Sequence, residues 1–190
     1  MYHIPNDQRA YRSASRFVAT LENCLQRSKL NAISVSALCR EAGMTRNTFY
    51  RLFDNLTDVL RYHCDSALSS FLSTRPRRTS TPKQDFLISL KALMQHPLLL
   101  DAMLANDRAD LICQSILDNK EILCNRYKGI TGLTEDQLDY FIYGSSMTIA
   151  GYLRVWYLRG KKETAEEICD ILLLGTDIFT HLLGDAKQDR

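Results

Sequence analysis

The spacing of apolar residues along the chain predicts an all-α protein. A first helix is expected behind a cap at Asn6, with apolar positions recurring at helical spacing from Ala10 to Leu25. No stretch shows convincing strand alternation, and leucine far outnumbers valine, which favours helices because β-branched residues prefer strands. Beyond residue 56, helices are predicted over 57–73, 83–95, 97–105, 107–128, 134–159 and 164–183.

Two short helices separated by a tight turn are predicted within residues 34–52. Ser34 is a suitable N-cap for the first of them, and Gly43 ends it because glycine adopts positive φ without a Cβ clash. Only Met44 separates this glycine from Thr45, a second N-cap. Two short helices joined by a glycine-containing turn and packed on a longer first helix are typical of a helix-turn-helix.

Charge is distributed unevenly along the chain. Residues 1–83 contain 13 Lys and Arg against 6 Asp and Glu, whereas residues 84–190 contain 11 against 16. The segment 74–82 (TRPRRTSTP), with two prolines, cannot continue a helix and is predicted to be a linker. A basic N-terminal part favours contact with phosphate, and an ordinary fluctuation in charge is the alternative.

Several classes of function have no support in the sequence. No run approaches the roughly 18 apolar residues that span a bilayer, and residues 1–7 lack the pattern of a signal peptide, so we expect a cytoplasmic protein without membrane contact. The six cysteines form no CxxC pair and are interpreted as reduced packing residues. No phosphate loop, metal-ligand set or nucleophile motif occurs, so we expect neither an enzyme nor a metal or cofactor.

Residues 34–53 read SVSALCREAGMTRNTFYRLF and resemble the DNA-binding signature of the tetracycline-repressor (TetR) family. The polar caps, the Ala-Gly turn and the Thr-Phe-Tyr and Phe positions carry the resemblance, which continues more loosely over 151–172. It implies a helix-turn-helix DNA-binding domain over 1–56 and a helical regulatory (ligand-binding) and dimerisation domain over 57–190. The chain departs from the family at Leu56, where a phosphate-contacting lysine is common, and this puts one backbone contact in doubt.

The second short helix is expected to place its exposed side in the major groove of DNA. There Arg46 suits guanine, Asn47 suits adenine and the Thr48 methyl suits thymine. By resemblance, Tyr50 contacts a backbone phosphate. An exposed polar helix face is the alternative. The predicted DNA-binding residues are Ser34, Thr45, Arg46, Asn47, Thr48, Tyr50 and Arg51.

Apolar residues in the last two helices cover more than the single stripe expected of a surface helix in a monomer. The resemblance implies a homodimer in which two copies of these helices form a four-helix bundle, and a larger monomer core is the alternative. A dimer would hold two recognition helices about 34–36 Å apart, so the operator should be a pseudo-palindrome in double-stranded DNA. The predicted interface residues are Leu153, Trp156, Ile171, Leu174, Ile178 and Leu182.

Tyr127, Tyr143, Ser146 and Tyr152 place polar tips near apolar helix faces, as in a small-molecule site. Ordinary core polar groups are the alternative. The resemblance implies a transcriptional regulator, with repression as the usual mode, that an effector releases from its operator. The rival is a TetR-like regulator or co-activator that a protein partner controls without any small-molecule ligand.

Overall fold

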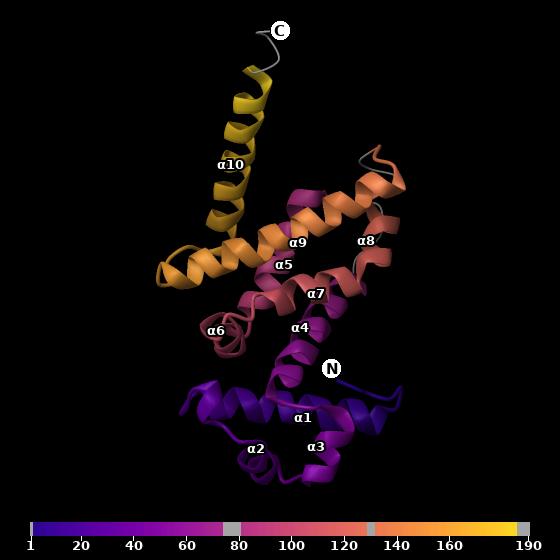
Figure 1. The fold of residues 1–190 in the computed structure, drawn as a ribbon, viewed down its shortest axis with the longest axis vertical. Helices are drawn as coiled ribbons and strands as arrows, with labels where there is room; N and C mark the ends of the chain where they lie inside the picture. Colours follow the sequence, from indigo (N-terminus) through magenta and orange to yellow (C-terminus); the bar gives the residue numbers. More distant parts are fainter. Residues whose placement is uncertain (1, 74–80, 129–131, 186–190) are drawn as a thin grey trace.

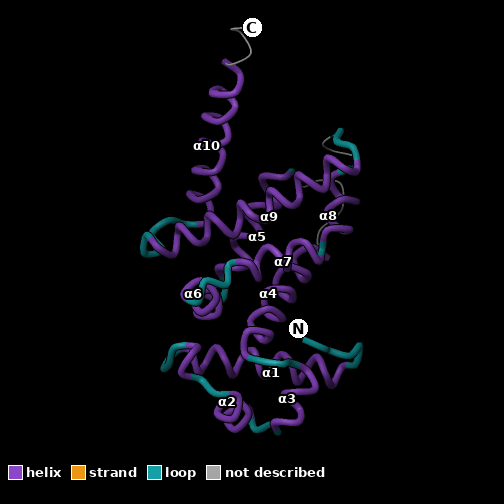
Figure 2. The backbone as a smooth tube through the Cα atoms, viewed as in Figure 1, coloured by secondary structure: helices purple, strands orange, loops and turns teal. Residues whose placement is uncertain are grey.

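The protein is helical throughout the part of the chain that the structure describes. The computed structural model describes residues 2–73, 81–128 and 132–185. Within these ranges 78% of the protein is helix, in ten α-helices and one short 3-10 helix, and no strand occurs (Figure 2). The prediction of an all-α fold is confirmed.

The first three α-helices form one end of the molecule (Figure 1). They are α1 (Gln8–Leu25), α2 (Val35–Ala42) and α3 (Arg46–Leu52), with the 3-10 helix η1 (Leu30–Ala32) before α2. Phe17 of α1 meets Phe49 of α3 edge to face, with ring centroids 5.3 Å apart, and meets Phe53 at 6.1 Å. All three rings are fully buried, so this cluster holds α3 against α1.

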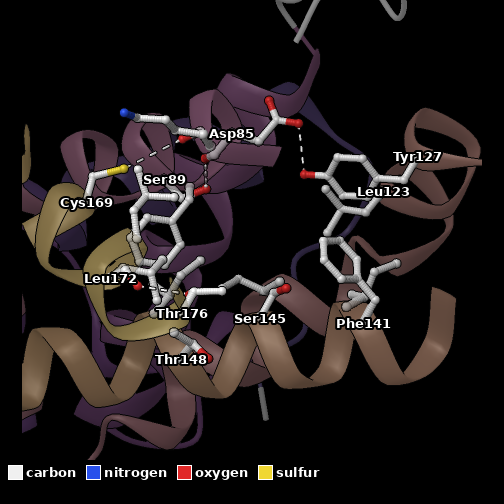
Figure 3. A pocket seen from close by; sticks show the side chains of 16 residues that line it. Asp85, Ser89, Leu123, Tyr127, Phe141, Ser145, Thr148, Cys169, Leu172 and Thr176 are labelled. Atoms are coloured by element: carbon white, nitrogen blue, oxygen red, sulfur yellow. Dashed lines mark hydrogen bonds between the residues drawn. The ribbon is translucent and has the colours of Figure 1, made fainter. Parts of the chain in front are cut away.

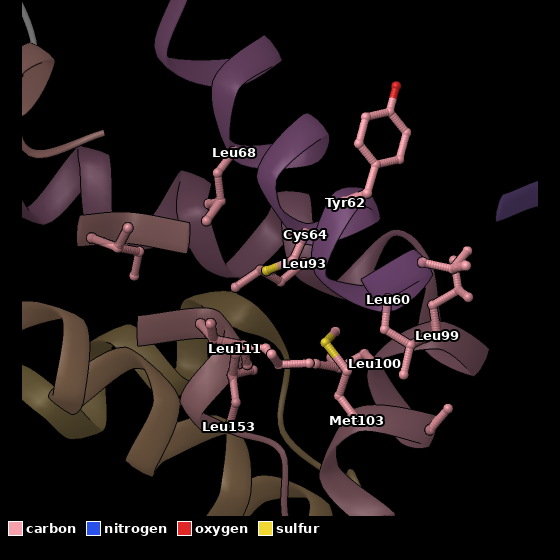
Figure 4. Close-up of a cluster of buried hydrophobic side chains, with 14 of the residues drawn as sticks. Leu60, Tyr62, Cys64, Leu68, Leu93, Leu99, Leu100, Met103, Leu111 and Leu153 are labelled. Atoms are coloured by element: carbon pink, nitrogen blue, oxygen red, sulfur yellow. The ribbon is translucent and has the colours of Figure 1, made fainter. Parts of the chain in front are cut away.

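The remaining seven α-helices form the rest of the molecule, and α4 connects them to α1–α3 (Figure 1). Leu60 and Leu68 on α4 are buried together with Leu100 of α6 and Leu153 of α9 (Figure 4). They belong to one core whose members range from α1 to α10. These helices are α4 (Leu56–Ser73), α5 (Pro82–Met94), α6 (Pro97–Ala105), α7 (Asp110–Asp118), α8 (Lys120–Tyr127), α9 (Glu135–Leu158) and α10 (Ala165–Asp185).

The helix predicted over 107–128 is interrupted, and that prediction was wrong. The chain leaves helical geometry at Asn119, where ψ is 13°, and this residue separates α7 from α8. Its side-chain amide donates to the Ser115 carbonyl at 2.9 Å and so satisfies a carbonyl at the end of α7. Asparagine competes with the backbone for such bonds, which is why it favours helix ends.

Two smaller boundaries also differ from the prediction. The cap of α1 is Asp7, whose carboxylate accepts from the Arg9 amide at 3.0 Å, and not Asn6. Residues 74–80 of the predicted linker over 74–82 lie outside the described residues, whereas Thr81 is the N-cap of α5 and Pro82 is its first residue. There Thr81 and Gln84 form a capping box, in which each side chain accepts from the other residue's amide.

The last two helices differ in how much of their surface is covered. α9 packs along α7 and α8, whereas α10 leaves the end of α9 and projects away from the body (Figure 1). Ile168 and Cys169 near the start of α10 are buried, but Leu174 and Ile178 further along are exposed. Among the described residues, no single helix is long and apolar enough to cross a membrane.

Candidate functional site

The turn between α2 and α3 is defined by three local features that the sequence predicts. The Ser34 hydroxyl accepts from the Ala37 amide at 3.1 Å and caps α2. Gly43 ends α2 with φ at 62°, a left-handed conformation that favours glycine. The Thr45 hydroxyl accepts from the Thr48 amide at 3.1 Å and caps α3. The start of each helix and the end of α2 are therefore defined by bonds and backbone geometry between near neighbours.

The outer side of α3 is polar and open to solvent. Phe49 and Leu52 are buried against the rest of the protein, which turns the opposite side of this short helix outward. On that side the Arg46 guanidinium lies over the Tyr50 ring, 5.7 Å from its centroid. Asn47 is exposed beside them. The side thus offers a guanidinium, an amide and a phenol at once, which are groups that bind base edges and phosphates.

The predicted DNA-binding residues lie together around this turn. Arg46, Asn47, Tyr50 and Arg51 are exposed on α3, and Thr48 is half-buried. Ser34 and Thr45 lie at the starts of α2 and α3, where their hydroxyls act as caps. The structure gives these two residues a role in shaping the turn, which does not depend on DNA.

The start of α4 differs from a phosphate-binding helix end. Leu56 is half-buried and packs against the core. The buried Asp58 carboxylate accepts from the Asp54 amide at 2.9 Å, so the first turn of α4 carries a negative charge. The Asp58 amide in turn donates to the Asn55 side-chain oxygen at 3.1 Å. Side chains of the protein therefore already bind backbone amides at the start of this helix.

Further along α4, a polar cluster links this helix to α7 and to the N-terminal segment. Arg61 lies 2.9 Å from Asp65 and also contacts Gln114 and Asp118 on α7. The Tyr2 hydroxyl donates to Asp65 at 2.6 Å. Burial and the Asp65 carboxylate raise the pKa of Tyr2 well above its usual range, so its proton stays in this bond. Sequence reasoning missed this cluster because its members are far apart in the chain.

A cavity of about 330 Å³ lies between α5, α7, α8, α9 and α10 (Figure 3). Phe86, Ile142 and Leu172 contribute apolar walls. At one side the buried Asp85 carboxylate accepts from Arg126 at 3.1 Å and from the Tyr127 hydroxyl at 2.9 Å. The volume is within the range of small-molecule sites, at the lower end of roughly 300–1,000 Å³.

The four predicted effector residues do not share this cavity. Tyr127 lines it, and burial together with Asp85 raises the pKa of Tyr127 well above its usual range. Tyr143 is 57% exposed, and Ser146 is buried with its hydroxyl donating to the Tyr143 carbonyl. Tyr152 lines a second hollow, of about 560 Å³, between α9 and α10. The four side chains therefore lie on different sides of their helices.

The predicted dimer residues also divide into two groups. Ile171, Leu174 and Ile178 are exposed on α10 and are free to meet another surface. Leu153 is fully buried within the protomer, so it has no surface to offer a partner and belongs to the core. Trp156 is also buried, and its indole N–H donates to the Glu163 carbonyl at 2.8 Å.

The surface of the last two helices is described except near the end of α10. The side chain of Leu182, the sixth predicted interface residue, lies outside the described residues. Sequence reasoning did not predict that several apolar residues of α9 are exposed, because the sequence pattern does not distinguish core-facing from solvent-facing positions on a helix that is apolar on several sides. They are Tyr140, Tyr143, Met147, Val155 and Leu158.

Metal binding has no candidate site in the described part of the chain, where no group of three or more His, Cys, Asp or Glu side chains could hold an ion. All six cysteines are unpaired, five of them buried and Cys124 half-buried.

Among the comparisons with known proteins, only the one with solved structures finds a match, and it bears on the fold alone. No family model matches the chain, and no curated protein matches it in sequence. A solved structure does match. The crystal structure of Lin0861 from Listeria innocua superposes with a TM-score of 0.69, covering 93% of this chain and 96% of that one, at 16% sequence identity. At this identity the likeness establishes a shared helical fold.

Proposed function

We propose that the protein is a sequence-specific DNA-binding transcriptional regulator of the TetR type, and not an enzyme. The observation that carries this proposal is the polar outer side of α3, directly behind the capped turn at Gly43 and held on α1 by Phe17 and Phe49. In a helix-turn-helix, the second short helix enters the major groove with this side. In this proposal α1–α3 form the DNA-binding domain and the remaining helices the regulatory one.

Base recognition is assigned to Arg46 and Asn47, and phosphate contact to Tyr50 and Arg51. Arg46 rests on the Tyr50 ring in the free protein. Such a cation–π contact is worth about 0.5–1 kcal/mol at an exposed site, so a bidentate bond to guanine can replace it. The excess of Lys and Arg in residues 1–83 supports the same assignment, because phosphate contacts dominate affinity for DNA.

A homodimer is the second part of the proposal. Exposed Ile171, Leu174 and Ile178 on α10 lie on a helix that projects from the protomer, and α9 adds exposed Met147 and Val155. Burying such surface against a second copy stabilises a two-fold interface. Two copies would then bind a pseudo-palindromic operator in double-stranded DNA.

The third part is control by a small molecule, with repression as the mode of regulation. The cavity beside Asp85 supports this reading over control by a protein partner, since it is lined by five helices, two of which, α5 and α7, pack on α4. The dimer would have two states that differ in the distance between its recognition helices. A ligand that binds the cavity more tightly in one of these states would shift the protein to that state. The apolar hollow between α9 and α10 favours the rival, a protein partner, if dimerisation leaves it open.

Selection of binding sites from a random duplex library tests the proposal and identifies the operator in the same experiment. We expect enrichment of a pseudo-palindrome whose half-sites are about one DNA turn apart, bound with a stoichiometry of one or two dimers. Affinity for it should fall steeply with salt and exceed that for random duplex by about 10³-fold or more. An unenriched library, or equal affinity for selected and random duplex, would refute sequence-specific binding.

A further inference from the structure

The cavity between α5, α7, α8, α9 and α10 has walls whose chemistry selects among ligands (Figure 3). Apolar side chains form most of its lining, and hydroxyl groups interrupt them at a few positions. Its volume of about 330 Å³ equals the space of about eleven water molecules at roughly 30 Å³ each. A molecule with one ring and a short substituent fits such a space.

Four of the five hydroxyl groups in the wall already donate a hydrogen bond within the protein, and Ser145 is the one that does not. Ser89, Thr148 and Thr176 each donate to the backbone carbonyl four residues earlier, over 2.8, 2.8 and 2.9 Å. The Tyr127 hydroxyl donates to Asp85 in the same way. A hydroxyl has a single proton but two lone pairs, so each of these groups faces a ligand as a hydrogen-bond acceptor. Most of the hydroxyls in the wall therefore favour a ligand that donates a hydrogen bond.

The charged groups at the wall are matched before any ligand enters. Asp85 is held by Arg126, whose side chain is 2% exposed, and by Tyr127. Lys83 lies 3.5 Å from Asp170 in an exposed pair. A charged ligand would lose its hydration in the cavity, and every charged side chain named here already has a partner of opposite charge. An uncharged ligand avoids this cost.

We infer that the cavity binds an uncharged, compact, largely apolar molecule that donates a hydrogen bond, of the class of one-ring alcohols and phenols. This inference rests on the proposed function, in which such a molecule would be the effector. A hydroxyl of Ser89, Thr148 or Thr176 would accept the hydrogen bond that the ligand donates, and the apolar walls would bury its ring.

Four probes of similar size separate the features of the ligand. Benzyl alcohol is neutral and donates, toluene is neutral and cannot donate, and benzoate and benzylamine carry opposite charges. Each is titrated into the full chain without DNA, and binding is followed by NMR of the methyl groups that line the cavity. We expect saturable binding of benzyl alcohol, with benzoate and benzylamine at least about 30-fold weaker.

Variants test whether the hydroxyls accept the hydrogen bond. We expect the affinity for benzyl alcohol, relative to that for toluene, to fall in Thr148→Val, Thr176→Val and Ser89→Ala. In the combined variant the fall should be about 3- to 10-fold. Thr180→Val is the matched control, because Thr180 donates to the Thr176 carbonyl at 2.9 Å one turn further along α10 and does not line the cavity. Its ratio of the two affinities should equal that of the wild type.

Three results would overturn the inference: no saturable binding of benzyl alcohol, tighter binding of benzoate or benzylamine, or an unchanged ratio in the combined variant. The proposed function is judged separately, by DNA binding of the same preparation without probes. Selective DNA binding without a preference for benzyl alcohol would overturn this inference alone. A preference for benzyl alcohol without selective DNA binding would overturn the proposed function and leave the inferred ligand class unaffected.

Discussion

Arg61 on α4 forms an ion pair with Asp118 on α7, a residue 57 positions further along the chain. The same guanidinium contacts Asp65 and Gln114, and its side chain is 12% exposed. α4 runs from the α1–α3 end of the molecule into its centre (Figure 1). This contact therefore ties the helix that leads to α1–α3 directly to the helices that surround the cavity.

Replacing Arg61 should destabilise the fold strongly. Arg61→Ala leaves Asp65, 11% exposed, without its main cation, and breaking a pair of this kind costs about 3 kcal/mol. Urea denaturation measures the loss. Arg27→Ala is the matched control, since its pair with Glu41 is exposed and solvent screens it, so a much smaller loss is expected there. Equal losses in the two variants would contradict the importance of the α4–α7 contact.

Replacing two residues of α3 should affect DNA binding differently. Arg46→Ala is expected to cost about 1–3 kcal/mol on the selected operator and to relax preference at one base pair. Tyr50→Phe should weaken selected and random duplexes alike, because a phosphate contact carries no sequence information. Competition binding at two salt concentrations separates these outcomes. If Arg46→Ala also weakens both duplexes equally, Arg46 contacts phosphate and reads no base.

Acid should destabilise the protein through His63. Its ring packs edge-on against His96, with centroids 4.5 Å apart, and the His96 ring lies 3.3 Å from Glu22 of α1. Burial, with a smaller contribution from His96, lowers the pKa of His63 to about 4, against about 6.5 in an unfolded chain. The unfolded state therefore binds the proton more readily between these values, and stability falls as pH drops from about 6.5 to 4, by about 3 kcal/mol.

Denaturation at several pH values measures this effect. His63→Gln should flatten the dependence of the free energy of unfolding on pH between 4 and 6.5, whatever its cost at neutral pH. His181→Gln, at an exposed position on α10, should leave the dependence as it is in the wild type. A variant at position 63 with the full wild-type dependence would assign the effect to other groups.

A charge on the exposed side of α10 should disrupt association. Leu174 is 61% exposed in the protomer, and Leu174→Asp would place an unpaired carboxylate in the proposed interface. We expect monomers by sedimentation, with the free energy of unfolding of the protomer nearly unchanged, and weaker operator binding. Ile122→Asp, at an apolar position of α8 with 46% exposure, should remain dimeric. Dimers in both variants would exclude this side of α10 as the interface.

The parts of the molecule that sequence reasoning predicted well are local ones. Ser34, Gly43 and Thr45 act on amides and carbonyls a few residues away, so the bounds of α2 and α3 follow from neighbouring residues. The error at Asn119 is also local, because its side chain ends α7 with a bond to Ser115 that periodicity does not register. Prediction was weaker for α9, where several sides are apolar and no pattern separates core from surface.

Spacing and bonds between near neighbours were enough to predict the helical class, the capped turn before α3 and the polar side chains that α3 carries. Three features follow from the packing of distant segments instead: Leu153 belongs to the core, Tyr127 and not Tyr143 lines the cavity, and Asp85 pairs with Arg126. Asp85 and Arg126 are 41 positions apart, and their pairing depends on how α5 and α8 pack around a shared core. Long-range packing of this kind sets which side of a helix faces a cavity, and it leaves no local signal in the chain.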